Sequence, residues 1–270
     1  MPELPEVENF KLYFNKKCCN KTILDIECYE KRLIKRISFS DFVKKLKGKK
    51  FTKAERRGKV LIITADDLKQ KLIIHFGMTG GLHCVKSDVP KIGEDRFSRV
   101  IFKFKNGYEM RWLNRRKLGK IWLVESIKEV DLLKKMGKEP LEMSKNEFLE
   151  ALNNCSGKIK SVLMNQEIIA GIGNIYSDEI LFQSRITPFR KIQDLTLREK
   201  DALYKNMKKV LKKAIELAKD TYYYGQPIEF PKTWIIPFRH KGICPNNKNH
   251  KLKRVSIAGR NSYYCPVCQK

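Results

Sequence analysis

The sequence predicts an α+β protein with two main domains and a small cysteine-rich tail. Short runs in the first half alternate apolar and polar residues with a period of two, which is typical of β-strands. Beyond Gly137 the period lengthens to that of an α-helix, and the tail carries Cys244, Cys265 and Cys268. We therefore expect domains at residues 1–134, 135–235 and 236–270.

The charge of the chain indicates the class of partner. Its 270 residues contain 57 Lys and Arg against 30 Asp and Glu, a formal net charge of +27. With 42% hydrophobic residues the chain can build a core, so the charge does not indicate disorder. Cations beside phosphates release condensed counterions, so this surplus favours a nucleic acid. The alternative is a lysine-rich proteome in which every surface is basic.

Targeting signals are not evident in the sequence. No apolar run approaches the roughly 18 residues of a membrane-spanning helix, and residues 1–8 are acidic where a signal peptide would be basic. We therefore expect an intracellular protein of the cytoplasm or nucleoid with no membrane partner. In that compartment its eight cysteines are thiols or metal ligands rather than disulfides.

The first domain begins with a helix over residues 3–17. Val7, Phe10 and Phe14 share one face of it, and Pro2 and Pro5 fall at its start, where proline is tolerated. Predicted strands follow at residues 22–29, 60–65, 72–76, 100–105, 108–112 and 121–124. These short strands predict an antiparallel sandwich or barrel.

The sequence also predicts the type of one turn in this domain. Asn106-Gly107 separates two alternating runs, and this dipeptide favours a two-residue hairpin turn of type I′ with positive φ at both positions.

Two capping boxes start helices in the second domain. Ser144 with Glu147 and Thr196 with Glu199 have the required spacing, and the second pair opens a long amphipathic helix. Between them a glycine-rich turn, residues 170–174, runs directly into a further predicted helix. Such a helix start suits a phosphate, but a tight packing turn between helices fits the sequence equally well.

The tail has the spacing of a metal site. Cys265 and Cys268 can bind one tetrahedral zinc, and Cys244 lies upstream. Asn247 stands where a complete ribbon would have its fourth cysteine, so His250 is the preferred fourth ligand and His240 the alternative. Four protein ligands would close the coordination shell, which predicts one structural zinc.

Several segments together resemble one known family. They are residues 2–8 (PELPEVE), 56–59 (RRGK), 75–80 (HFGMTG), 171–176 (GIGNIY), 259–260 (GR) and 264–269 (YCPVCQ). In this order they resemble the formamidopyrimidine-DNA glycosylase and endonuclease VIII family of base-excision repair enzymes, over nearly the whole chain. The resemblance implies a helix on a two-sheet β-sandwich as the catalytic domain, a helix-two-turn-helix domain, a zinc-finger hairpin, and a monomer that binds double-stranded DNA.

The first residues allow the chemistry of such an enzyme. Removal of Met1 would expose the secondary α-amine of Pro2, and terminal amines have a pKa of about 7.7 to 8.0, so part of it is nucleophilic at neutral pH. Attack on the sugar C1′ gives an iminium that drives β- and then δ-elimination. Glu3 beside it can act as general acid and base. The alternative is that Pro2 and Glu3 only begin a helix.

The resemblance assigns further residues to the DNA. Lys59 would contact the phosphate next to the lesion and assist elimination, and His75, Asn174 and Arg260 would be further DNA contacts. Met78 would fill the gap left by the extruded base, together with Arg116 and Leu118 from residues 114–119 (NRRKLG). The family usually has an aromatic residue where this chain has Leu118.

The lesion preference is not settled by these motifs. Leu4 after Glu3, and Glu6 as a base-pocket residue, favour oxidised purines such as formamidopyrimidines and 8-oxoguanine. The short tyrosine-rich segment around residues 222–224 is more typical of members that remove oxidised pyrimidines. We expect oxidised purines as substrates. A damaged-DNA-binding protein without activity and a zinc-ribbon RNA-binding protein are the alternatives from other classes.

Overall fold

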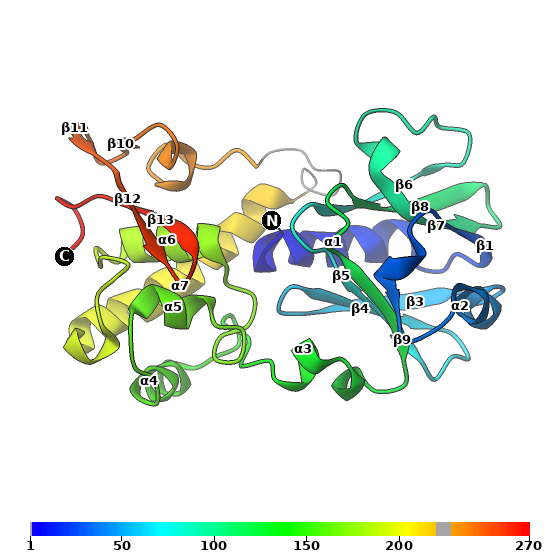
Figure 1. The fold of residues 1–270 in the computed structure, drawn as a ribbon, viewed down its shortest axis with the longest axis horizontal. Coiled ribbons are helices and arrows are strands. Elements are labelled where there is room, and N and C mark those ends of the chain that lie inside the picture. Colours follow the sequence, from blue (N-terminus) through cyan, green and yellow to red (C-terminus); the bar gives the residue numbers. More distant parts are fainter. Residues whose placement is uncertain (1, 220–227) are drawn as a thin grey trace. The chain divides into compact units, whose positions relative to one another are not determined.

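The computed structural model describes residues 2–219 and 228–270, so Met1 and the tyrosine-rich segment around residues 222–224 lie outside the described residues. The chain forms two compact units, Met1–Lys134 with Ala218–Ile228 and Lys135–Leu217 with Glu229–Lys270. Figure 1 shows mainly strands in the first unit and mainly helices in the second. The predicted α+β class is confirmed. No helix within the described residues is long and apolar enough to span a membrane.

The first unit contains one long helix and two sheets. Helix α1 spans Leu4–Lys17. The four-stranded sheet has the order β1 (Ile23–Cys28), β7 (Ser98–Phe104), β8 (Tyr108–Asn114) and β6 (Gly80–Lys86). The five-stranded sheet has the order β2 (Ile34–Lys35), β9 (Lys120–Val124), β5 (Lys71–His75), β4 (Val60–Ala65) and β3 (Phe51–Arg57). All neighbouring strands are antiparallel except β2 and β9. Two short helices, α2 (Phe39–Leu46) and α3 (Asp131–Lys134), complete the unit.

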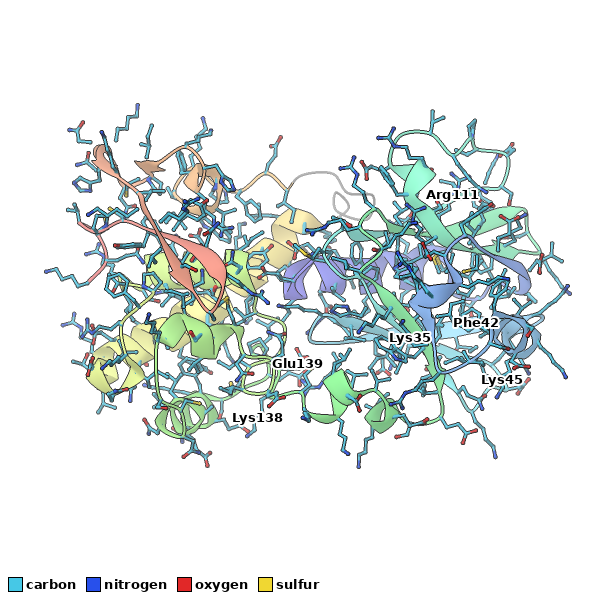
Figure 2. The ribbon with its side chains drawn as sticks, viewed as in Figure 1. Lys35, Phe42, Lys45, Arg111, Lys138 and Glu139 are labelled. Atoms are coloured by element: carbon cyan, nitrogen blue, oxygen red, sulfur yellow. The ribbon has the colours of Figure 1, made fainter. Side chains whose placement is uncertain are left out.

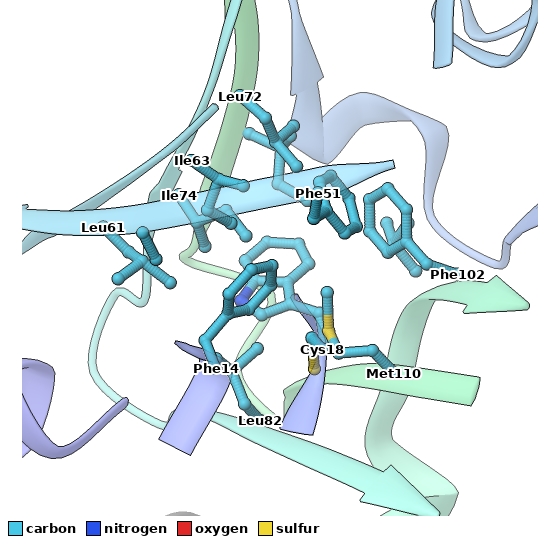
Figure 3. Close-up of a cluster of buried hydrophobic side chains, with 14 of the residues drawn as sticks. Phe14, Cys18, Phe51, Leu61, Ile63, Leu72, Ile74, Leu82, Phe102 and Met110 are labelled. Carbon is cyan, nitrogen blue, oxygen red and sulfur yellow. The ribbon is translucent and has the colours of Figure 1, made fainter. Parts of the chain in front are cut away.

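The core of this unit lies between the two sheets. Phe14 of α1 packs edge-on against Phe51 of β3 with ring centroids 5.3 Å apart, and Phe51 packs against Phe102 of β7 at 5.6 Å. Figure 3 shows this cluster, in which Ile74 of the five-stranded sheet and Met110 of the four-stranded sheet also take part. The apolar stripe of α1 is therefore buried by both sheets at once, which fixes the position of the helix.

A buried ionic network holds β6, β8 and the loop before β7. Arg111 of β8, labelled in Figure 2, is fully buried and donates to Glu109 and Asp95 at 2.6 Å each. Asp95 also contacts His83 Nδ1 of β6 at 3.0 Å. Each buried charge thus has a hydrogen-bonded partner of opposite charge, as burial requires.

The β7–β8 hairpin forms where Asn106-Gly107 predicted it, but its turn differs from the prediction. Residues 105–107 make a three-residue loop, and of these only Gly107 has a positive φ, 76°. Asn106 instead accepts a hydrogen bond from the Tyr108 N–H through its side chain, at 3.3 Å. A three-residue hairpin loop needs just one left-handed residue, and Gly107 supplies it.

The second unit is built from four helices and two small hairpins. The helices are α4 (Lys145–Asn153), α5 (Ile159–Met164), α6 (Asn174–Gln183) and α7 (Leu197–Ala218). The hairpins pair β10 (Ile243–Cys244) with β11 (Asn247–Lys251) and β12 (Lys253–Ile257) with β13 (Arg260–Tyr264). Both predicted capping boxes form. Glu147 N–H donates to Ser144 Oγ at 3.2 Å, and Glu199 N–H donates to Thr196 Oγ1 at 3.2 Å.

Asp178 joins the tail hairpin to the helices. This buried carboxylate of α6 pairs with the buried Lys160 of α5 and with Arg239 at 3.0 Å. It also accepts hydrogen bonds from Ser262 Oγ at 2.6 Å and from Tyr263 N–H at 3.1 Å, both on β13. One carboxylate thus connects three segments of the second unit.

Asp178→Ala should strongly destabilise this unit, because it removes the carboxylate that pairs with the buried Lys160 and with Arg239 and that accepts the hydrogen bonds of β13. We expect a loss of about 3–5 kcal/mol in the free energy of unfolding. Asp194→Ala removes the same charge from an exposed position and serves as the control. Urea unfolding followed by far-ultraviolet circular dichroism, whose helical signal comes mainly from the second unit, measures the difference. Equal midpoints for the two variants would contradict this role of Asp178.

Candidate functional site

The start of α1 places two candidate catalytic residues in a fixed and buried position. Glu3 is the N-cap of α1 and is fully buried, and Pro2 directly before it is also buried. Glu6 closes a capping box, because its carboxylate accepts the Glu3 backbone N–H at 2.8 Å. Asn9 Nδ2 donates to the Pro5 carbonyl at 2.9 Å and supports the same turn. The backbone beside Pro2 is thereby held rigidly.

Lys59 occupies the tip of a hairpin that is attached to the same helix. Gly58 and Lys59 form the two-residue turn between β3 and β4, and Gly58 has a φ of 55°. Arg56 Nε donates to Glu8 of α1 at 2.8 Å, and Arg56 Nη1 donates to the Gly58 carbonyl at 3.0 Å. One guanidinium therefore connects the turn that carries Lys59 with the helix that begins at Glu3.

The Arg56–Glu8 pair is partly shielded from water. Burial alone would raise the pKa of Glu8, but hydrogen bonds from Lys11 and Arg56 outweigh it and hold this pKa below its ordinary value. Glu8 thus remains a carboxylate at neutral pH and stays paired with Arg56.

His75 ends β5 and faces the strand that follows Lys59. It pairs with Val60 of β4 and with Lys120 of β9. Burial, followed by the charges of Lys59 and Lys120, lowers the pKa of His75 to about 4. The imidazole is therefore neutral at pH 7, and its Nδ1 accepts the Gly77 N–H at 3.3 Å. With Nδ1 an acceptor, Nε2 of the neutral ring carries the proton and is a donor.

Two loops bring together Met78, Arg116 and Leu118, the residues predicted to fill a gap in the DNA stack. Arg116 N–H donates to Thr79 Oγ1 at 3.0 Å, and Arg116 Nη1 lies 3.2 Å from Met78 Sδ. All three of the predicted residues are exposed, and two of them present large apolar side chains to solvent, Met78 at 41% and Leu118 at 46% exposure. An exposed apolar pair beside a cation suits insertion between bases.

Asn114 organises both of these loops, a role that the sequence did not reveal. Its buried side chain donates to the Phe76 carbonyl at 2.9 Å and accepts the N–H groups of Leu118 and Gly119 at 3.0 and 3.3 Å. The loops also touch directly, since a Cβ on Gly77 would lie 2.7 Å from the Gly119 nitrogen. Glycine at position 77 is thus required by both the close approach and its φ of 64°.

In the second unit, Asn174 and Arg260 are brought to adjacent positions. Asn174 opens α6 after the turn at Gly171, whose φ is 87°, and its Nδ2 donates to the Asn261 carbonyl at 3.1 Å. Arg260 precedes Asn261 in β13, directly after the two-residue turn Ala258-Gly259, and its side chain is exposed. The helix start and the hairpin tip therefore form one polar surface.

Gln166 holds the glycine-rich turn in shape and was not singled out by its sequence context. Its Nε2 donates to the carbonyls of Met164 at 2.8 Å and Ile172 at 2.7 Å, and its Oε1 accepts the Gly171 N–H at 2.9 Å. These contacts orient the backbone before Asn174.

The tail contains a group of four side chains with the geometry of a zinc site. One ligand atom from each of Cys244, His250, Cys265 and Cys268 lies within 4.8 Å of the others. Cys244 Sγ and Cys268 Sγ are 3.7 Å apart, far beyond a disulfide bond, and His250 Nδ1 lies 3.6 Å from Cys268 Sγ and 3.9 Å from Cys265 Sγ. A tetrahedral zinc with bonds of about 2.0–2.3 Å separates its ligands by similar distances. The cluster is thus compatible with one structural zinc.

His240 lies outside this cluster. Its Nδ1 is 3.3 Å from the Tyr263 hydroxyl and its ring packs edge-on against the Tyr263 ring. His250 is therefore the histidine that the fold of the tail offers to a metal.

Comparisons with known proteins agree along the full chain. Residues 1–121 match the formamidopyrimidine-DNA glycosylase N-terminal domain, residues 136–224 the H2TH domain of these enzymes, and residues 250–270 a zinc finger found in FPG and IleRS. Formamidopyrimidine-DNA glycosylase of Pelotomaculum thermopropionicum is 35% identical, with 100% of this chain and 99% of the relative covered. The chain belongs to the formamidopyrimidine-DNA glycosylase family.

Other family members are similar to this chain in sequence and in structure. Formamidopyrimidine-DNA glycosylase of Carboxydothermus hydrogenoformans is 34% identical over the whole of both chains. The Lactococcus lactis family member in complex with an abasic site containing DNA has a TM-score of 0.88 and 29% identity, with 99% of each chain covered. A complex of the same protein with DNA that contains an oxidised pyrimidine also has a TM-score of 0.88, with full coverage of both chains. The family resemblance of the sequence motifs is confirmed.

Asn114→Ala should loosen both loops that carry Met78, Arg116 and Leu118. It leaves buried backbone groups unpaired, at a cost of about 1–3 kcal/mol in the free energy of unfolding. Asn114→Asp keeps the acceptor for both N–H groups and should restore part of the loss. Urea unfolding and amide hydrogen exchange at Leu118 and Gly119 measure both effects. Unchanged exchange in the alanine variant would contradict the assignment.

The metal cluster predicts one zinc per purified chain. His250→Ala and Cys268→Ser should each lower the bound zinc, and chelation should lower the thermal midpoint of the second unit, because the short tail strands have little apolar core of their own. Cys155→Ser, which removes a thiol outside the cluster, is the control, and elemental analysis is the measurement. A larger zinc loss in His240→Ala than in His250→Ala would overturn the ligand assignment.

Proposed function

We propose that this chain is a base-excision repair DNA glycosylase with abasic-site lyase activity. It removes oxidised bases from duplex DNA through a Schiff base on Pro2, followed by β- and δ-elimination. The observation that carries the proposal is the rigid, buried N-cap Glu3 directly after Pro2, in a chain of the formamidopyrimidine-DNA glycosylase family. Solved relatives of similar fold hold DNA with an abasic site or with N7-benzyl-Fapy-dG.

Pro2 is the proposed nucleophile. After removal of Met1 its secondary amine attacks the sugar C1′, the damaged base leaves, and the product is a positively charged iminium. This cation acidifies the C2′ proton, so the 3′ phosphate departs by β-elimination and the 5′ phosphate by δ-elimination. Glu3 exchanges protons with the sugar and the departing base, and its buried position at the helix start keeps its carboxyl close to the reacting atoms.

Lys59 and His75 are proposed to bind the phosphate beside the lesion. Lys59 provides a cation at a hairpin tip, where the side chain can reach the DNA backbone. His75 is neutral at pH 7 and provides a hydrogen-bond donor without adding a charge. In this arrangement Lys59 stabilises the charge of the leaving phosphate during elimination, and His75 only donates a hydrogen bond.

Asn174 and Arg260 are proposed to hold further phosphates of the same strand. They lie together on the second unit, where the start of α6 meets the β12–β13 turn. Contacts of this kind position the duplex and bend it around an extruded nucleotide, but they carry no information on the base. The zinc then has a structural role, because it supports the hairpin that carries Arg260.

Met78, Arg116 and Leu118 are proposed to occupy the space left by the extruded nucleotide. Arg116 would face the orphaned base, and the two apolar side chains would replace the lost stacking. Leu118 fills space without an aromatic ring, so it contributes less stacking energy than the usual family residue.

Oxidised purines, formamidopyrimidine and 8-oxoguanine, are the proposed substrates, with Glu6 at the base pocket. Glu6 is nearly buried beside Glu3, which supports this placement. Oxidised pyrimidines are the second candidate, since a solved relative is described in complex with an oxidised pyrimidine containing DNA.

We also propose that the domains follow the three matched segments, at residues 1–134, 135–235 and 236–270. The protein would act as a monomer on double-stranded DNA in the cytoplasm or nucleoid. Its bacterial relatives support this location.

Borohydride trapping tests the reaction. Duplexes that contain 8-oxoguanine, a formamidopyrimidine, an oxidised pyrimidine or an abasic site should each be compared with undamaged DNA. We expect a covalent adduct on Pro2 with the preferred lesions and with the abasic site, located by mass spectrometry of the N-terminal peptide. Absence of an adduct with every lesion would overturn the enzymatic function in favour of damaged-DNA binding alone.

Substitutions distinguish the proposed roles of Glu3 and Lys59. Glu3→Gln should lower base removal by at least 100-fold, the size of a general acid or base contribution. Lys59→Ala should slow elimination more than base removal. Lys212→Ala, which removes an exposed lysine on α7, is the charge-matched control for Lys59→Ala and should lower only the salt-dependent affinity for DNA.

A further inference from the structure

Two thiols from distant parts of the sequence meet at the end of α1 farthest from the proposed catalytic residues. Cys18 is the C-cap of α1, and Cys84 lies on β6. Cys84 packs against the buried apolar cluster that contains Cys18, and each of the two thiols shifts the pKa of the other. Neither belongs to the metal cluster or to the proposed reaction.

Further contacts hold Cys84 against the last turns of α1. Cys84 N–H donates to the Tyr13 hydroxyl at 2.9 Å, and that hydroxyl lies 3.3 Å from the Cys84 carbonyl. The Cys84 thiol also donates to the Lys17 carbonyl at 3.5 Å. The approach of the two sulfurs is therefore built into the packing of α1 on β6.

The two thiols have different surroundings. Cys18 is fully buried in the apolar cluster of Figure 3, near Phe14 and Met110. Cys84 is half-buried and lines a surface cavity together with Tyr13, Lys16, Lys17 and His83, so small solutes can reach it.

The surroundings also shift the pKa values of the two thiols in opposite directions. The hydrogen bond from Cys18, followed by the charges of Lys21 and Lys17, lowers the pKa of Cys84 despite its partial burial. Burial, followed by the hydrogen bond with Cys84, raises the pKa of Cys18 well above its ordinary value. A more acidic, accessible thiol beside a buried, protonated one is the arrangement of an attacking and a resolving cysteine.

We propose that Cys84 and Cys18 form a peroxide-responsive thiol pair that closes reversibly to a disulfide between α1 and β6. The Cys84 thiolate attacks one oxygen of hydrogen peroxide, the O–O bond breaks, and the products are a sulfenic acid and hydroxide. Cys18 sulfur then attacks the Cys84 sulfur, the S–O bond breaks, and the leaving hydroxide takes the Cys18 proton as water. In sum, two thiols and one peroxide give one disulfide and two waters.

The disulfide would connect the final residue of α1 to β6 and leave the start of the helix untouched. Fourteen residues of helix, roughly 20 Å, separate the two ends. Oxidation should therefore raise the resistance of the first unit to unfolding, because it closes a long loop, and should leave base removal unchanged. Peroxide is among the oxidants that damage bases, so the bond would form under conditions in which a repair enzyme is needed.

Peptide mapping of the zinc-loaded full chain tests the pair. Cys19→Ser removes the neighbouring thiol, which donates to Asn15 Oδ1 at 3.3 Å and whose pKa is raised by burial. Trypsin then gives residues 18–21 and 72–86, each with a single cysteine. After mild peroxide we expect these two peptides to be joined by a disulfide that dithiothreitol cleaves, at one bond per chain and without dimer formation. Peroxide that leaves Cys84 a free thiol, or links it to another cysteine, would overturn the proposal.

Two variants test the order of the steps. In Cys18→Ser, the sulfenic acid of Cys84 has no resolving thiol, so dimedone should label Cys84 several-fold more than in the wild-type chain. In Cys84→Ser, Cys18 should remain a thiol under the same peroxide exposure. Equal dimedone labelling of Cys84 with and without Cys18 would contradict a resolving role for Cys18. All of these measurements are independent of glycosylase activity, so the pair and the proposed function can fail separately.

Discussion

The burial of α1 between two sheets is the constraint on which the first unit depends. Val7, Phe10 and Phe14 are fully buried, and each such side chain contributes about 1.5–3 kcal/mol to folding. A helix held by both sheets cannot shift without the loss of this burial. The first residue of α1 therefore has a defined position, and so do Pro2 and Glu3 directly before it. The proposed nucleophile Pro2 thus stands at the start of a helix that is buried against both sheets, whereas chain ends are usually mobile.

The second unit holds its tail against the helices largely by polar contacts. Its tail offers few apolar contacts, and the small cluster around Phe182, Ile235 and Cys265 is supplemented by the Asp178 carboxylate and the metal ligands. Buried ionic groups of this kind contribute less net stability than apolar packing, but they require one geometry. That geometry keeps Asn174 and Arg260, the residues proposed to contact phosphates, in a fixed relation.

Periodicity and capping rules predicted the longer helices and the central strands, because these elements carry apolar residues at a regular spacing or in continuous runs. The helix predicted over residues 3–17 and the helix opened by Thr196 both form. Strands β3 and β6 were missed, since both are sheet edges, the first interrupted by charges and the second opened by two glycines. Asn114, Gln166 and Asp178 were missed for a different reason. Their roles depend on partners far apart in the sequence, and a single polar residue gives no periodic signal.

The net charge of +27 identified the class of partner but not the residues that would meet it. Several cations are already engaged within the protein, Arg56 with Glu8, Lys160 with Asp178 and Arg111 with Asp95. By contrast, Lys59 belongs to a tight hairpin turn and Arg260 directly follows one, and each stands next to a glycine with a positive φ. A two-residue turn projects a side chain beyond the sheet and fixes the backbone behind it, which is what a phosphate contact requires. The position of a cation in the fold therefore says more about its role than the total charge does.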